Sequence, residues 1–187
     1  MDSMNPNLNH AGLTSTWHLA ETPLEAAVTE FEWAMLRWAE AFERYQLEML
    51  NRLGQSSLST QEVQLLHAIR MKDRPKATSM IASLLNRDDI QNIQYSLRKL
   101  VAQKLVKKMK DGVGKSYNLS VTEKGRRLTD DLASIRRKLL VEQVETVENG
   151  EARLHETARM VTLMAGICNE GARTFAPREA LSAAPEA

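Results

Sequence analysis

The apolar residues of the chain follow a helical spacing over long stretches. Between residues 24 and 53 they recur at alternating steps of four and three, which is typical of a long amphipathic helix with a narrow apolar seam. Thr22 can cap this helix, Pro23 suits its first position, and Gly54 is placed to end it. The sequence therefore predicts one long helix before the centre of the chain.

The second half of the chain repeats this pattern. Thr122 can cap a helix whose seam continues to residue 142, and the dipeptide Asn149-Gly150 then breaks it. Alternating steps of four and three return between Leu154 and Phe175. A small central core offers too little surface to bury three such seams, so we expect a second copy of the chain to cover them.

Shorter elements lie between these long helices. Ser59 and Glu62 have the spacing of a capping box, and residues 77–85 predict another short helix. After a polar turn, Asp88 or Asp89 caps a further helix, whose apolar side chains are expected to be buried: Ile90, Ile93, Leu97 and Leu100. The period then changes, and the stretches 105–109 and 116–121 predict two strands around a turn with two glycines.

The order of these elements predicts a winged helix-turn-helix. The expected fold class is mainly α with a small β-hairpin wing and long N- and C-terminal dimerisation helices. The expected parts are a flexible N-terminal arm (1–22), a dimerisation helix (23–54), a DNA-binding lobe (55–121), C-terminal dimerisation helices (122–175) and a disordered tail (176–187).

The net charge of +1 conceals a strong division along the chain. Residues 70–127 carry 15 basic and 5 acidic side chains, whereas residues 1–69 carry 3 and 9 and residues 128–187 carry 7 and 10. A basic block between two acidic flanks is typical of a nucleic-acid surface held in a helical frame, although a solvated face gives a similar pattern.

The composition argues against several other classes of protein. No apolar run is long enough for a membrane span, residues 1–16 do not resemble a signal peptide, and the single Cys168 excludes an intrachain disulfide, so we expect a cytoplasmic protein. Cys168 lies on the seam of the last helix, which favours packing over redox sensing. The histidines lack metal-ligand spacing and no catalytic motif is present, so we expect no metal, no cofactor and no enzyme activity.

Several stretches resemble the MarR family of winged helix-turn-helix regulators. Residues 58–66 are similar to the start of the family's DNA-binding lobe, residues 89–100 to its recognition helix and residues 105–108 to its first wing strand. The phrase Leu119-Ser-Val-Thr-Glu-Lys-Gly125 is similar to the family's strand-to-helix junction and is the most specific match. The resemblance covers about residues 24–173. It implies a homodimeric repressor that binds a pseudo-palindromic operator and is released by a small ligand. The first long helix is also similar to that of nicotinate-pathway repressors in this family.

The predicted recognition helix has a polar face for the major groove. The candidate base-reading side chains are Gln91, Asn92, Gln94, Tyr95 and Arg98. Amide side chains can bond adenine in two places and arginine can do the same to guanine, and each good pair discriminates by roughly 1–3 kcal/mol. The candidate phosphate contacts are Lys99, Lys108, Lys110 and Lys115. Lys110 and Lys115 would replace the Asp-x-Arg that is usual at the family's wing. The alternative is an ordinary polar helix face.

The resemblance also implies a small-molecule site, often for an aromatic acid, between the dimer helices and the DNA-binding lobe. An aromatic wall beside an arginine that pairs with a carboxylate suits such a ligand. The candidate residues are Trp33 and Arg37 on the first long helix, His67 and Arg70 on the next helix, and Trp17 and His18 on the arm. The alternative is that these side chains pack in the core or find local partners.

Two other functions fit the same elements. One is a winged-helix DNA-binding protein without an effector, and the other is a protein-interaction module built on the same fold. The expected partners are double-stranded DNA, a second copy of the chain and a small aromatic carboxylate, with no membrane.

Overall fold

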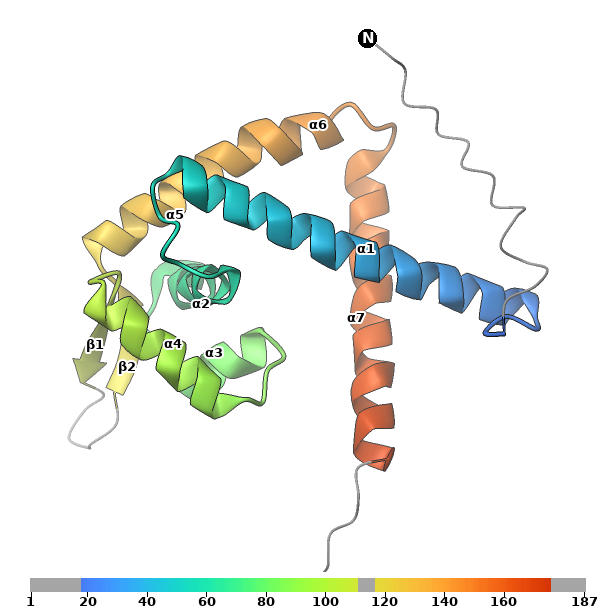
Figure 1. Ribbon diagram of the computed structural model, residues 1–187, viewed down its shortest axis with the longest axis horizontal. Coiled ribbons are helices and arrows are strands. Elements are labelled where there is room, and N and C mark those ends of the chain that lie inside the picture. The colour runs from blue at the N-terminus through green and yellow to red at the C-terminus, as the bar shows by residue number, and fades with distance from the viewer. Residues whose placement is uncertain (1–17, 111–116, 176–187) are drawn as a thin grey trace, which may run out of the picture. The chain divides into compact units, whose positions relative to one another are not determined.

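The computed structural model describes residues 18–110 and 117–175 (Figure 1). It divides into two compact units, Met1–Leu132 and Ala133–Ala187. Trp17, Lys115, most of the expected arm and the expected tail lie outside the described residues.

The first unit contains the long N-terminal helix and the predicted winged helix. Its elements are α1 (Pro23–Arg52), α2 (Thr60–Arg70), a 3-10 turn (Met71–Asp73), α3 (Thr78–Leu84), α4 (Ile90–Ala102), β1 (Val106–Lys110), β2 (Tyr117–Val121) and most of α5 (Glu123–Arg136). Figure 1 shows α2, α3 and α4 gathered beside the hairpin of β1 and β2. The expected class, mainly helical with a two-stranded wing, is confirmed.

The second unit is helical throughout its described elements. The last residues of α5 lead into a π-helical turn (Arg137–Val141), the short α6 (Glu142–Val144) and the long α7 (Gly150–Phe175). The sequence predicts one regular helix from Thr122 towards the break at Asn149-Gly150, and the π turn interrupts that regularity. Asn149, in the left-handed region at φ 54°, makes the predicted break before α7.

Local capping explains where α1 and α2 begin. Thr22 Oγ1 accepts from the Glu25 amide at 3.2 Å, and the Glu25 carboxylate accepts from the Thr22 amide at 2.8 Å. Ser59 and Glu62 repeat this reciprocal pair at 3.2 and 2.9 Å. Both capping boxes satisfy amides that the first turn of a helix leaves without partners.

The ends of α3 and α4 share one geometry. After α3, Asn86 has φ 51° and the Arg87 amide donates to the Ala82 carbonyl at 3.0 Å. After α4, Lys104 has φ 60° and the Leu105 amide donates to the Leu100 carbonyl at 3.0 Å. Both are Schellman motifs, which turn the chain sharply and satisfy helix-end carbonyls. The first turns the chain into α4 and the second turns it into the wing.

The hairpin is joined to the helices by two backbone links. Val106 pairs with Val121 at one end of the ladder and Lys110 with Tyr117 at the other. Lys76, before α3, forms an isolated antiparallel bridge with Leu119, with N–O distances of 2.9 and 2.8 Å. This bridge fixes the α2–α3 loop to the wing.

The junction between β2 and α5 depends on a close approach of two backbone segments. The Thr122 amide donates to the Leu105 carbonyl at 3.0 Å, and the Thr122 hydroxyl donates to the Lys104 carbonyl at 2.6 Å. A Cβ atom on Gly125 would lie 2.1 Å from the Leu105 oxygen. The glycine in the most specific phrase of the sequence is therefore required by backbone packing.

The apolar core belongs to the first unit. Among the described residues, every buried apolar side chain lies between Met49 and Leu132, including the fully buried Leu65, Leu66, Ile69, Ile81, Ile93, Leu100, Leu105 and Leu119. This core fixes α4 and the hairpin in one arrangement.

Two burial predictions are wrong for the single chain. Ile90 is 41% exposed, because it is the first residue of α4 and a side chain there points back over the preceding turn rather than into the core. Cys168 is exposed on α7. Its seam was expected to pack, but the apolar side chains of α7 around it are themselves exposed.

Candidate nucleic-acid interface

One face of α4 is packed against the core and the other is open to solvent. The buried side chains are Ile93, Ser96, Leu97 and Leu100. The exposed ones include all five candidate base-reading residues, Gln91, Asn92, Gln94, Tyr95 and Arg98. Tyr95 is 64% exposed, and Arg98 has no ion pair with any described residue. The helix therefore presents amide, phenol and guanidinium groups on one accessible surface.

The start of this helix is held by an ion pair. Arg87 Nε donates to Asp89 Oδ1 at 2.8 Å, and its Nη2 bonds Oδ2 of the same carboxylate. This two-point contact lowers the pKa of Asp89 and raises the pKa of Arg87. Asn92 Nδ2 also donates to Asp89 Oδ2 at 3.3 Å, which leaves its second N–H and its side-chain carbonyl oxygen open for other hydrogen bonds.

Lys99 makes an internal contact instead of pointing freely into solvent. Its ammonium lies 2.9 Å from the Glu62 carboxylate, which is 4% exposed, and donates to the Ser57 carbonyl at 3.0 Å. Glu62 is also the capping residue of α2. This contact ties α4 to the start of α2, and the charge of Lys99 is paired within the lobe.

The other candidate phosphate contacts in the described region lie on the wing, among further lysines. Lys107, Lys108 and Lys110 are exposed on β1. Lys108 Nζ lies 4.3 Å from the centre of the Tyr117 ring on β2, a cation–π contact that joins the two strands. Lys110, at the end of β1, has no ion pair with a described residue.

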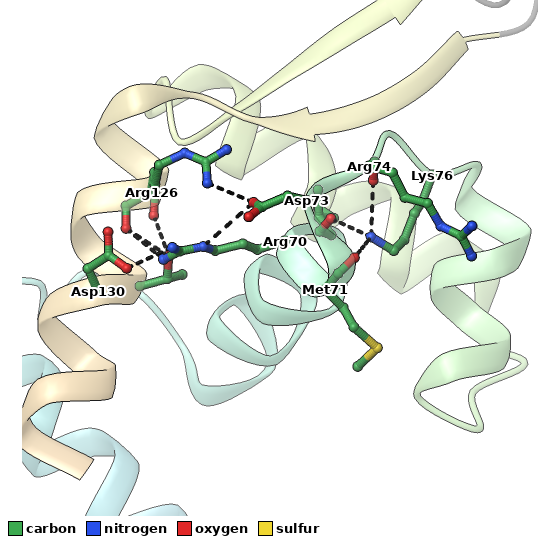
Figure 2. A network of polar contacts seen from close by, with 10 residues as sticks. Arg70, Met71, Asp73, Arg74, Lys76, Arg126 and Asp130 are labelled. Carbon is green, nitrogen blue, oxygen red and sulfur yellow. Dashed lines mark hydrogen bonds and ion pairs between the residues drawn. The ribbon is translucent and has the colours of Figure 1, made fainter. Parts of the chain in front are cut away.

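A network of polar contacts joins the end of α2 to the start of α5 (Figure 2). Arg70 Nη2 lies 2.7 Å from Asp130 Oδ1, and Nη1 donates to the Arg126 carbonyl at 3.0 Å and to the Thr129 hydroxyl. Arg126 in turn pairs with Asp73 at 2.7 Å. Arg70, one of the candidate ligand residues, therefore has its guanidinium occupied by protein groups.

The other side of the same loop is closed by Lys76, which is 3% exposed (Figure 2). Its ammonium donates to the carbonyls of Ile69 at 2.8 Å, Arg74 at 3.0 Å and Met71. Burial lowers the pKa of Lys76, the charge of Arg74 lowers it further, and the charge of Asp73 opposes both effects. The sequence analysis counted Lys76 only as part of the basic block, and no local signal distinguishes it.

The basic block therefore contains two kinds of cation. Those with acidic or carbonyl partners inside the lobe are Arg70, Lys76, Arg87, Lys99, Lys124, Arg126 and Arg127. Those that are exposed and form no ion pair with a described residue are Lys72, Arg74, Arg98, Lys104, Lys107, Lys108 and Lys110. The second group leaves a net positive, accessible charge around α4 and the wing, which is the surface that a polyanion requires.

Residues 58–125 match the family of winged helix DNA-binding domains. This stretch is therefore similar to a winged helix DNA-binding domain. Its limits enclose α2, α3, α4, the hairpin and the first residues of α5. No curated protein matches the chain in sequence.

Solved structures extend the likeness of this winged helix protein to the flanking helices. Staphylococcus aureus MarR, in complex with salicylate and kanamycin, matches at a TM-score of 0.62 and 16% identity, over 79% of this chain and 95% of that chain. BldR from Sulfolobus solfataricus, a transcriptional regulator, matches at 0.55 and 25% identity, over 72% and 96% of the two chains. The S. aureus MepR–DNA complex matches at 0.57 and 15% identity, over 72% and 97%.

These matches confirm the resemblance to MarR-family regulators at the level of the fold. Residues 58–125 therefore match a winged helix DNA-binding domain, and the fold of the longer chain is similar to that of MarR-family regulators. The likeness of the first helix to nicotinate-pathway repressors stays a prediction.

The remaining candidate ligand residues of the winged helix protein lie on the surface of the single chain. Trp33 and Arg37 are exposed on α1, His67 is exposed on α2, and His18 is exposed just before α1. Within residues 18–110 and 117–175, no group of three acidic, histidine or cysteine side chains is arranged to hold a metal ion. No helix in these ranges is both long and apolar enough to cross a bilayer.

Proposed function

We propose that the protein is a sequence-specific transcriptional repressor that binds a pseudo-palindromic operator as a homodimer. The observation that carries this proposal is the exposed face of α4, where Gln91, Gln94 and Arg98 are exposed to solvent beside the exposed lysines of β1. A helix that shows amide and guanidinium groups can read base edges in the major groove. The lysines can neutralise the flanking phosphates.

A gel-shift titration with the DNA upstream of the protein's own gene tests the DNA-binding part. We expect a shifted band that weakens as salt rises, because phosphate contacts release counterions. Changing Arg98→Ala together with Lys110→Ala should weaken binding by more than about tenfold and reduce the salt dependence. Arg153→Ala with Arg159→Ala, two exposed cations of α7, is the matched control and should leave binding unchanged.

The two results that contradict the proposal differ in meaning. An absent band at low salt would favour the protein-interaction module. A band that survives the Arg98 and Lys110 changes would place the DNA surface elsewhere on the chain.

The exposed apolar side chains of the long helices support the homodimer. On α7, Leu163 is 57% and Ile167 is 56% exposed, four residues apart on one face of the helix. Burial of such side chains in a partner contributes about 25 cal/mol per Å² of apolar surface. Sedimentation velocity of Leu163→Asp should show a monomer where the unchanged protein is a dimer. Thr162→Asp, at an exposed polar position next to it, is the control for adding a charge.

We further propose that a small aromatic carboxylate releases the protein from DNA. Trp33 and Arg37 are one helical turn apart on α1 and exposed, which suits a ring and a carboxylate respectively. The structurally similar S. aureus MarR was solved in complex with salicylate, which is an aromatic acid. Because Arg70 is already bound to Asp130, Arg37 is the arginine that we assign to the ligand.

Salicylate is a direct probe of this second proposal. It should raise the melting temperature of the protein and weaken the gel-shift band, and both effects should fall in Trp33→Ala and Arg37→Ala. Arg44→Ala changes another exposed arginine of α1, which pairs with Glu40, and should leave both effects intact. If salicylate and a panel of related aromatic acids change neither melting nor DNA binding, the function without an effector is the better one.

A further inference from the structure

The first turn of α4 contains an aliphatic side chain that the core does not use. Ile90 continues the buried seam in the sequence, yet it is 41% exposed, while Ile93 and Leu100 on the same seam are fully buried. Its neighbours Gln91 and Asn92 are exposed as well. Ile90 thus belongs to the accessible surface of the helix rather than to the core.

The position of Ile90 matters because the N-terminal residues of a recognition helix are those that reach base edges. Two carboxylates precede it: Asp88 is exposed and forms no ion pair with a described residue, whereas Asp89 is paired. Asp89, whose carboxylate would repel DNA, is held in a two-point ion pair by Arg87. Asn92 is oriented by the same carboxylate and keeps its carbonyl oxygen open.

The major groove offers an aliphatic side chain such as that of Ile90 only one apolar group to contact. Thymine carries a C5-methyl group there, whereas the other bases present hydrogen-bond donors and acceptors at their edges. An aliphatic side chain beside a donor or acceptor would desolvate it without replacing its hydrogen bond. Contact with the methyl group instead buries apolar surface on both sides.

We propose that Ile90 is a specificity-determining residue that selects thymine through contact with its C5-methyl group. This inference rests on the proposed DNA-binding function and adds one base preference in each half-site. Ile90 would then contribute to base recognition together with the amide and guanidinium groups of α4.

The experiment begins with the DNA sequences that the full-length protein selects from a random pool. Each thymine of the selected site is then replaced, one at a time, by deoxyuridine, which removes the methyl group and nothing else. We expect one thymine in each half-site at which this replacement weakens binding by about fourfold, the value of one buried methyl-sized group. Fluorescence anisotropy measures the dissociation constants.

Variants then connect that methyl group to Ile90. Ile90→Ala should bind the thymine site more weakly than the unchanged protein does, and should bind the thymine and deoxyuridine sites equally. Leu84→Ala removes an exposed aliphatic side chain of α3 and should retain the fourfold difference. Circular dichroism spectra of both variants establish that the fold is kept.

The outcomes separate this inference from the function on which it rests. Failure of the pool to yield any selected sequence overturns the proposed function. A selected site whose thymines can all be replaced without loss, or an Ile90→Ala protein that keeps the deoxyuridine penalty, overturns the role of Ile90 and leaves the DNA-binding function standing.

Discussion

The winged helix lobe and α7 differ in where their apolar side chains find contacts. In the lobe, Leu65, Ile81, Ile93 and Leu119 are fully buried among elements of the same unit. Along α7, none of the side chains from residue 151 to residue 174 is buried, although the helix carries an apolar seam. The lobe therefore has its own source of stability, whereas a helix such as α7 takes most of its stability from whatever covers its apolar face.

The largest difference in stability between the two regions is expected when a glycine in each is replaced by alanine. Gly125→Ala places a Cβ atom 2.1 Å from the Leu105 oxygen, a clash with backbone that side-chain movement cannot relieve. We expect a loss of about 4 kcal/mol in the free energy of unfolding, measured by urea denaturation.

Gly166→Ala is the matched change on α7, where no atom lies within 4 Å of the added Cβ. It should be neutral or stabilise the helix by up to about 1 kcal/mol, because alanine favours a helix more than glycine does. Equal losses in the two variants would contradict the contrast between a closely packed lobe and an open helix.

The second prediction concerns the internal ion pair of the lobe. Lys99→Met leaves the Glu62 carboxylate buried without its cation, which should cost about 3 kcal/mol of stability. DNA affinity measured at a temperature where the variant is folded should also fall, because α4 loses its link to α2. Lys107→Met, an exposed cation of β1 with no described ion pair, should change stability by less than about 0.5 kcal/mol. A stable Lys99→Met protein would mean that Glu62 is satisfied by its capping contacts alone.

The third prediction tests α7 by dilution. If a second copy of the chain covers its seam, association stabilises the folded dimer. A hundredfold dilution of the protein should then lower the free energy of unfolding of the associated helices by about 2.7 kcal/mol. Circular dichroism melting curves at several protein concentrations measure this shift. A melting temperature independent of concentration would contradict the homodimer, whereas the lobe's own core needs no partner.

Much of this contrast could be predicted from the sequence, because its signals are local. The Ser59–Glu62 capping box spans three residues and formed as expected. Thr22 caps α1 as expected, although its reciprocal bond with Glu25 was not predicted. The change of period that predicts the hairpin is local as well, and so is the order of elements that predicts the winged helix.

What the sequence did not predict depends on residues far apart in the chain. Lys99 meets Glu62 across 37 positions, and Lys76 bridges Leu119 through its backbone while its side chain closes the α2–α3 loop. Both lysines looked like part of one basic surface. The burial prediction for Ile90 was wrong for a related reason. Periodicity indicates on which face of a helix a side chain lies, but not where along the helix the core ends.

The smallest expected effect lies at the junction between α4 and the wing. Lys104 has φ 60°, a left-handed conformation that costs a residue with a Cβ atom roughly 1–2 kcal/mol. Lys104→Gly removes this strain but gives the unfolded chain more freedom, which takes back part of the gain. We expect a net stabilisation of about 0.5 kcal/mol by urea denaturation, with Lys104→Ala as the control that removes the charge and keeps the strain. Both variants should keep the backbone turn that directs the wing. After correction for the lost charge, their DNA affinity should therefore equal that of the unchanged protein. A destabilised glycine variant would show that the Lys104 side chain, and not the backbone turn, supports this junction.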